Sequence, residues 1–258
     1  MPHPVLAAVQ RLDPIDLDTV EQRAALQRRV DRKYLVPTPV WIEVVEALAA
    51  DHVALEVDGD RLSRYETIYF DTPDLRTYRD HVDGERPRWK VRSRRYVGGD
   101  KSSFELKVKQ EDDETVKDHL DGDDADHGNL DRARAFLGEH LRERTGEELP
   151  AGLAPSLITR FRRGTLLERD GSQRVTFDLD LELVRPDGAL ARLDADWVLV
   201  ETKSEGGDGR CDELLAQRGI EPVAMSTYRT GIALLVTDEP QDAGTGAAER
   251  FALEGAPV

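Results

Sequence analysis

The sequences RWKVRSRRY at residues 88–96 and SFELKVK at residues 103–109 decide the fold of this chain. Apolar and charged residues alternate in both segments. Such alternation is typical of β-strands, because successive side chains point to opposite faces of a sheet. The segment VGGDK at residues 97–101 predicts a tight turn, so the two strands form a hairpin. One face of this hairpin carries Arg88, Lys90, Arg92, Arg94, Lys107 and Lys109.

The same design recurs along the chain. Further strands are predicted at residues 29–36, 64–71, 156–163, 174–184 and 197–203. Helices are predicted at residues 39–50, 72–78, 130–144 and 211–218, with Thr38 as a helix cap. Residues 230–236 are compatible with a helix or a buried strand, and residues 111–126 with an acidic loop or a strand between loops. Because this order is not βαβα, we expect an α+β fold built on a mostly antiparallel sheet or barrel.

The charged faces of these strands leave two arrangements open. In an ordinary antiparallel sheet they would face water. In a closed barrel they would face a central tunnel, with helices covering the apolar outside. Rows of Arg and Lys on one face repel each other unless an anion lies among them, which favours the tunnel. A chain of phosphate groups suits such a site, because Arg and Lys bind phosphate by charge-assisted hydrogen bonds.

Glu201 is the carboxylate that stands out among these bases, in the strand at residues 197–203. Carboxylate oxygens suit Mg²⁺ or Mn²⁺, and such an ion bridges a carboxylate and substrate phosphates. The alternative is a salt bridge between Glu201 and a neighbouring basic residue. The strand pattern does not distinguish these two roles.

The composition limits the classes of function. The 258 residues include 52 acidic and 36 basic ones and carry a net charge of −16, which argues against general nucleic-acid binding. The single Cys211 excludes an intramolecular disulfide. We find neither a signal peptide nor an apolar run of the ~20 residues that span a bilayer, so we expect a cytoplasmic protein without a membrane segment of its own. Residues 18–237 are predicted to form one domain, between flexible segments at residues 1–17 and 238–258.

Eight segments in order resemble the VTC (vacuolar transporter chaperone) domain, the polyphosphate polymerase domain of the triphosphate tunnel metalloenzyme (CYTH-like) superfamily. They are RVDRKYLV (29–36), YETIYFDTPDL (65–75), KVRSRRY (90–96), FELKVK (104–109), ITRFRR (158–163), RVTFDLDL (174–181), VLVETKSEG (198–206) and MSTYRTG (225–231). The resemblance implies an antiparallel β-barrel, the triphosphate tunnel, with helices packed outside. It also implies a metal-dependent enzyme that transfers the γ-phosphate of ATP to a growing inorganic polyphosphate chain.

The resemblance also implies site residues. Those expected to bind phosphate are Lys33, Arg92, Arg94, Lys107, Lys109, Arg160, Arg174, Lys203, Ser226 and Arg229. Of these, Lys33, Arg92, Arg94 and Lys107 are expected to act in catalysis by positioning the chain and stabilising charge. Glu201 is expected to hold Mn²⁺ or Mg²⁺.

Two departures from the family pattern keep other functions open. The family segment around Ser226 usually carries lysines, and here Arg229 is the candidate substitute. The first acid of the superfamily's N-terminal motif is replaced by Arg29, whereas the second is Asp31. The alternatives are a triphosphatase that hydrolyses triphosphate or polyphosphate and a non-catalytic polyphosphate-binding protein. Because the fungal domains are attached to membrane-spanning partners, a separate membrane partner is a further hypothesis.

Overall fold

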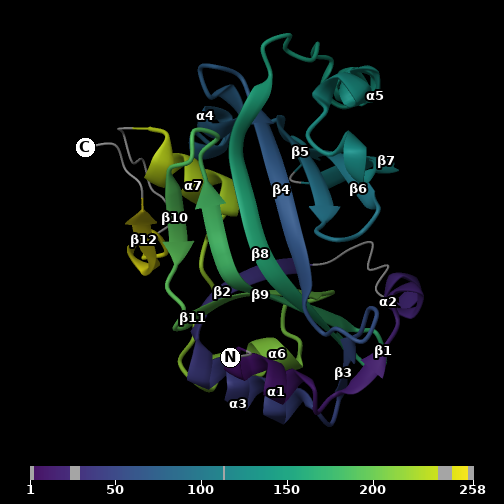
Figure 1. Cartoon of the computed structure of the whole chain (residues 1–258), viewed down its shortest axis with the longest axis vertical. Helices are drawn as coiled ribbons and strands as arrows, with labels where there is room; N and C mark the ends of the chain where they lie inside the picture. The colour runs from purple at the N-terminus through teal and green to yellow at the C-terminus, as the bar shows by residue number, and fades with distance from the viewer. Residues whose placement is uncertain (1–2, 24–29, 113, 238–245, 255–258) are drawn as a thin grey trace.

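A curved antiparallel sheet with helices on both sides forms the protein (Figure 1). The computed structural model describes residues 3–23, 30–112, 114–237 and 246–254. Its strands are β1 (Asp13–Ile15), β2 (Val30–Pro37), β3 (His52–Leu55), β4 (Ser63–Asp71), β5 (Arg88–Tyr96), β6 (Lys101–Lys109), β7 (Thr115–Asp123), β8 (Ala154–Glu168), β9 (Gln173–Val184), β10 (Leu190–Leu193), β11 (Trp197–Ser204) and β12 (Phe251–Glu254). Its helices are α1 (Pro4–Val9), α2 (Leu17–Arg23), α3 (Thr38–Leu48), α4 (Arg76–Val82), α5 (Leu130–Thr145), α6 (Arg210–Ala216) and α7 (Thr227–Leu235).

The main run of the sheet follows the order β7-β6-β5-β4-β8-β9-β11-β2, with antiparallel pairing throughout. Figure 1 shows β2 running across the long strands β4 and β8, so the sheet bends back on itself. The predicted α+β fold with an antiparallel sheet is therefore confirmed. The sheet does not close into the expected β-barrel, because within the described residues the end strands β2 and β7 do not pair.

Helices cover the apolar outer face of the sheet, as the strand pattern predicts. Trp89, Val91 and Leu106 of the β5–β6 hairpin pack against α5. Val175 and Phe177 of β9 pack in a second cluster with residues of α1, α3 and α6. We call the opposite face, which carries Lys33, Arg92 and Lys107, the inner face. The basic residues of the hairpin therefore point away from α5.

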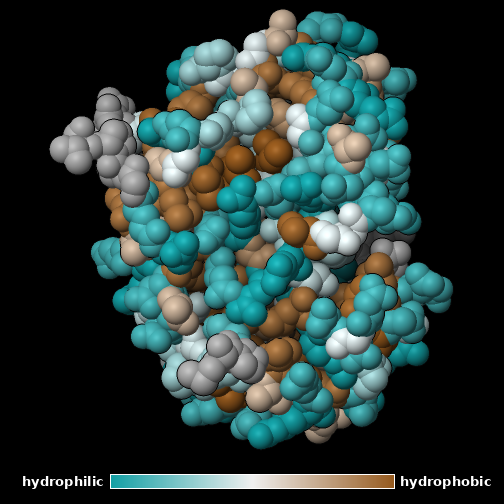
Figure 2. Space-filling model, viewed as in Figure 1, coloured by the Kyte–Doolittle hydropathy of each residue, from teal (hydrophilic) through white to brown (hydrophobic). Residues whose placement is uncertain are grey.

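Helix α7 covers part of the inner face, which the strand pattern does not predict. Tyr228 and Ile232 of α7 pack with Tyr69 of β4 and with Leu157 and Phe161 of β8. Figure 2 shows apolar side chains gathered in the region of α7 on a face that is otherwise largely hydrophilic. The inner face is therefore apolar where α7 covers it and charged beyond.

A β-bulge lets β9 contribute to both cores. Asp180 has a positive φ of 52°, and the pairing of β8 with β9 shifts between Arg160 and Arg162. Such a bulge places an extra residue in one strand and reverses which face the following side chains occupy. Leu179 accordingly joins the outer core, whereas Leu181 joins the inner core under α7.

Several predicted boundaries need correction. Residues 4–15, placed in a flexible segment by the sequence analysis, form α1 and β1, and Val5 and Val9 are fully buried. Residues 251–254 of the predicted C-terminal tail form β12, which pairs with β10. Thr38 is the first residue of α3 rather than its cap, and its hydroxyl donates to the Ala195 carbonyl. The remaining tail residues 1–2, 238–245 and 255–258, together with Arg29, lie outside the described residues.

Three other predictions are resolved by the structure. Helix α4 begins at Arg76, after the predicted start at Thr72-Pro73. Residues 230–235 belong to helix α7 rather than to a strand, and Val236 is its C-cap. The acidic segment contains β7, in agreement with the strand alternative. None of the helices in the described part of the chain is both long and apolar enough to cross a bilayer.

A substitution at Gly231 tests how closely helix α7 approaches the sheet. A Cβ atom at Gly231 would collide with the side chain of Leu157, which is fully buried. We expect Gly231→Ala to lower the free energy of unfolding by about 1–2 kcal/mol, because overpacking outweighs the gain in helix propensity. Chemical denaturation monitored by circular dichroism measures this change.

Gly138 of α5 provides the matched control. A Cβ atom there meets Leu149 at 3.8 Å, an ordinary contact distance. Gly138→Ala should therefore stabilise the protein by about 0.5–1 kcal/mol. Equal stabilisation by both substitutions would contradict the close packing of α7 on β8.

Candidate functional site

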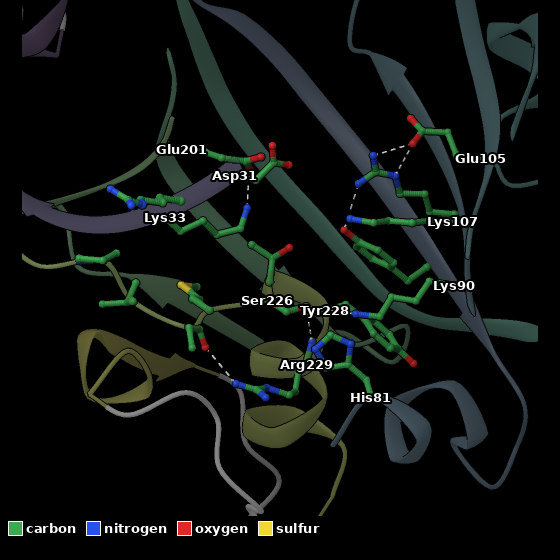
Figure 3. Close-up of a pocket in the computed structure, with 18 residues that line it drawn as sticks. Asp31, Lys33, His81, Lys90, Glu105, Lys107, Glu201, Ser226, Tyr228 and Arg229 are labelled. Carbon is green, nitrogen blue, oxygen red and sulfur yellow. Dashed lines mark hydrogen bonds and ion pairs between the residues drawn. The ribbon is translucent and has the colours of Figure 1, made fainter. Parts of the chain in front are cut away.

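A pocket with a volume of about 580 Å³ opens on the inner face, beside the first turn of α7. Figure 3 shows its side chains converging from strands on both arms of the curved sheet. The strand and α4 residues that line it are Asp31, Arg32, Lys33, Tyr69, His81, Lys90, Arg92, Glu105, Lys107 and Glu201. The segment at residues 222–229, which leads into α7, lines the remaining side.

The pocket has an excess of basic side chains. Among the described residues, six Lys or Arg side chains and three carboxylates line it. The chain as a whole carries a net charge of −16, so this local excess opposes the overall charge. Basic side chains in a concave, low-dielectric site strengthen each other's attraction for an anion. The pocket is therefore suited to a polyanion.

Glu201 lies between two lysines at the β2–β11 side of the pocket. Lys33 Nζ donates to Glu201 Oε2 at 2.5 Å, and Lys203 forms a second ion pair with Glu201. Lys203 also pairs with Asp31 at 3.0 Å. Burial and the nearby Arg163 lower the pKa of Lys33 to about 8. A salt bridge of Glu201, one of its two predicted roles, is thus present.

Glu105 holds the basic side chains of the β5–β6 side. Arg92 donates to it through Nε at 2.9 Å and Nη2 at 2.6 Å, and Lys117 of β7 pairs with it at 2.8 Å. Arg94 approaches it at 3.7 Å. Burial alone would raise the pKa of Glu105, but these three cations hold it well below its usual range. Glu105 thus fixes the direction of Arg92 toward the pocket.

Ser226 lies at the third side of the pocket, as the N-cap of α7. Its Oγ accepts the Arg229 backbone N–H at 3.4 Å, which fixes the start of the helix. Lys90 of β5 donates to the same Oγ at 3.4 Å, and its Nζ lies 5.4 Å from the centre of the Tyr228 ring. His81 of α4 also lines the pocket on this side. The tertiary fold thus places an ammonium group beside Ser226.

Six predicted site residues meet in the pocket. They are Lys33, Arg92, Lys107, Glu201, Ser226 and Arg229. Arg94 and Lys203 lie just outside this lining, where they contact Glu105 and Glu201. By strand register, Lys109 and Arg174 also belong to the inner face, opposite Arg88 and Lys203, but they do not line the pocket.

The prediction for Arg160 is wrong. Arg160 lies on the outer face with a half-exposed side chain and pairs with Glu66 at 2.7 Å. The strand pattern placed the apolar residues of β8 on the outside, whereas Leu157 and Phe161 pack inward under α7. Because neighbouring side chains in a strand point to opposite faces, Arg160 must point outward.

Arg163 occupies the inner face instead. It shares the face of Leu157 and Phe161, because side chains two residues apart in a strand point to the same face. Arg163 donates to Asp178 at 2.6 and 2.8 Å and lies over the ring of Phe161. The Asp178 carboxylate outweighs burial and raises the pKa of Arg163. The sequence analysis missed Arg163 because it placed the face of β8 that carries Leu157 and Phe161, and therefore Arg163, on the outside.

Lys90, Tyr69, Tyr228 and His81 are among the pocket residues that were not assigned to the site from the sequence. Lys90 belongs to the basic face that the alternation predicts, so a signal for it existed. Tyr69 and Tyr228 stack on each other beneath the pocket, with ring centres 5.0 Å apart. His81 has no signal in the sequence, because α4 reaches the pocket only through the tertiary packing of α4 against α7.

Glu201 and Asp31 are suitable donors for a divalent cation that arrives with phosphate. Both carboxylates reach the Nζ atom of Lys203, so they lie on the same side of the pocket. Within the described residues, no group of three or more His, Cys, Asp or Glu side chains is arranged to hold a metal ion. The donor set therefore fits an ion that takes its remaining ligands from substrate and water, as Mg²⁺ commonly does.

Comparison with known proteins identifies the family model that this chain fits. The model described as "VTC domain" matches residues 28–236. The search of curated protein sequences found no match.

Two solved structures show limited similarity. HpAC1 from Hippeastrum, described as having a dominant triphosphatase activity, has 14% identity and a TM-score of 0.47 over 83% of this chain and 99% of its own. Protein PH1012 from Pyrococcus horikoshii OT3 has 14% identity and a TM-score of 0.43 over 75% of this chain and 91% of its own. These values are low, and the assignment rests on the family model.

Arg92 and Arg160 lie on opposite faces of the sheet, so we expect their substitution to affect phosphate binding differently. Arg92→Met should weaken the binding of inorganic tripolyphosphate at least tenfold, because a charge-assisted hydrogen bond contributes about 1.5–3 kcal/mol. Arg160→Met should leave the affinity within about twofold of the wild type. Isothermal titration calorimetry measures both, and a tenfold loss in Arg160→Met would contradict the outward direction of Arg160.

Proposed function

Because this chain belongs to the VTC domain family, we propose that it is a metal-dependent polyphosphate polymerase. It transfers the γ-phosphate of ATP to a growing inorganic polyphosphate chain. The observation that carries this proposal is the cation-rich pocket on the inner face of an otherwise acidic protein. A triphosphatase would use the same pocket with water as the acceptor, and a binding protein would use it without reaction.

The basic side chains supply positioning and electrostatic stabilisation. Lys33 and Lys107 approach the pocket from opposite arms of the sheet, and Arg92 is held in place by Glu105. A phosphate chain between these arms would have the attacking and leaving oxygens oriented for in-line transfer. Charge that develops on the transferred group would lie next to preorganised cations. The reaction then requires no covalent intermediate with the protein.

Glu201 and Asp31 would hold the divalent cation, Mn²⁺ or Mg²⁺. When bound, this ion would neutralise charge on the phosphate oxygens during transfer. Lys33 and Lys203 neutralise the two carboxylates in the empty pocket. A phosphate chain offers these lysines several anionic oxygens, so we expect Lys33 to exchange Glu201 for phosphate when substrate binds. This exchange would free Glu201 for the cation.

Gel electrophoresis of the products of ATP with Mn²⁺ or Mg²⁺, with free phosphate assayed in parallel, tests the proposal. We expect a ladder of polyphosphate chains from the wild-type protein. Free phosphate without chains would establish the triphosphatase. Tight binding of short polyphosphate with neither product would establish the binding protein.

Glu201→Gln separates the metal role of this residue from its salt bridges. We expect turnover to fall at least a hundredfold while the melting temperature stays within a few degrees of the wild type. Tripolyphosphate should bind this variant at least as tightly as wild type in the presence of EDTA, because a negative charge has left the pocket. Undiminished turnover would contradict the assignment of Glu201 to the cation.

A further inference from the structure

Within the described residues, Lys90 forms no ion pair with an acid, in contrast to Lys33 and Arg92. Lys33 pairs with Glu201, and Arg92 pairs with Glu105. Among the described residues, the four charged groups that act most strongly on Lys90 are all cations: Lys107 of β6, Arg229 of α7, Arg92 of β5 and Lys33 of β2. Its ammonium group donates a hydrogen bond to the neutral hydroxyl of Ser226. The positive surroundings of Lys90 therefore favour the binding of an anion.

His81 faces the same part of the pocket from α4. The charged groups that act most strongly on it are Lys90, Arg229, Lys107 and Arg86, again all cations. Its Nδ1 atom is shielded from solvent and has no hydrogen-bond partner among the described residues. His81 also lines the pocket, so its ring can meet a ligand oxygen there. Figure 3 shows the His81 and Lys90 side chains approaching each other beside Tyr228.

We propose that Lys90, His81 and Ser226 form a subsite for one phosphate group of the substrate, and that this phosphate binds together with a proton that Lys90 takes up. This inference rests on the proposed function, because it assigns a place and a proton to part of the same polyanion. Nothing in the comparisons assigns a role to Lys90 or to His81. The subsite differs from the Glu201 side of the pocket in having cations and neutral donors without a carboxylate partner.

The uptake of a proton follows from the crowding of Lys90. Burial, followed by repulsion from Lys107 and Arg229, lowers the pKa of Lys90 to about 7 in the empty pocket. A bound phosphate attracts the ammonium form and raises this pKa again. Between the two pKa values, the complex holds one proton more than the free protein. Binding should therefore weaken as the pH rises above 7, whereas below pH 6 Lys90 is already protonated and adds no further pH dependence.

His81 serves as a neutral donor in the same subsite. Burial, followed by repulsion from Lys90 and Arg229, lowers its pKa to about 3. The imidazole therefore remains uncharged near neutral pH and adds no repulsion to the crowded cations. One of its ring nitrogens carries a hydrogen and can donate to a phosphate oxygen. Its contribution to affinity should not change the number of protons taken up.

The test is calorimetric titration of inorganic tripolyphosphate into wild type and Lys90→Arg at pH 8, without metal ions, in two buffers of different ionisation enthalpy. The buffer dependence gives the number of protons taken up per ligand. Arginine stays protonated in the empty pocket, so it has no proton to gain. We expect wild type to take up about one proton more than Lys90→Arg. Comparing the two proteins cancels the protonation of tripolyphosphate itself.

Two further variants complete the experiment. Lys101→Arg replaces an exposed lysine at the start of β6 and should keep the wild-type proton uptake. His81→Phe should weaken binding about tenfold and leave the proton uptake unchanged. Thermal melts check that each variant is folded.

The outcomes separate this inference from the proposed function. Tripolyphosphate binding with equal proton uptake by wild type and Lys90→Arg would overturn the subsite alone. Unchanged affinity in His81→Phe would remove His81 from the subsite. Failure of wild type to bind tripolyphosphate would overturn the proposed function and the subsite together.

Discussion

The crowding of like charge on the inner face is the constraint on which the rest of the structure depends. Lys33, Lys90, Arg92 and Lys107 all point into one pocket from two arms of the same sheet. In a low-dielectric site such cations repel each other strongly unless acids or a bound anion compensate them. The protein compensates part of this charge itself, through Glu201 and Glu105, and leaves the remainder for a ligand.

Some cations of the inner face are paired with acids and others are not, and this difference matters for both stability and ligand binding. Arg92, Arg163 and Lys33 are held by Glu105, Asp178 and Glu201, so these cations have fixed directions in the empty protein. Preorganised cations lose less side-chain entropy when a phosphate binds, which favours affinity. In the described part of the chain, neither Lys90 nor His81 is paired with such an acid. The protonation of Lys90 is therefore the property of the pocket that responds most to an anion.

The bulge at Asp180 and the packing of α7 make this pocket possible within a small fold. Because β9 changes faces at the bulge, one strand supplies Phe177 to the outer core and Leu181 to the inner core. Helix α7 then covers the apolar part of the inner face and brings its N-cap, Ser226, to the edge of the charged part. The same helix thus closes a core and forms one side of the pocket.

The sequence by itself determined the antiparallel sheet, the basic inner face of the β5–β6 hairpin and the meeting of Lys33, Arg92, Lys107 and Glu201. The sheet and the basic face follow from strand alternation, which is a local property of the chain, whereas the meeting of these four residues follows from the resemblance of the sequence to the VTC domain. Only the tertiary structure decided that Arg163 replaces Arg160, that His81 and Lys90 lie beside Ser226, and that α1 and β1 belong to the folded domain. Helix α7, which comes from a distant segment, determines which face of β8 becomes interior. A one-residue bulge reverses the faces of β9. Both effects depend on partners far away in sequence, so alternation alone does not contain them.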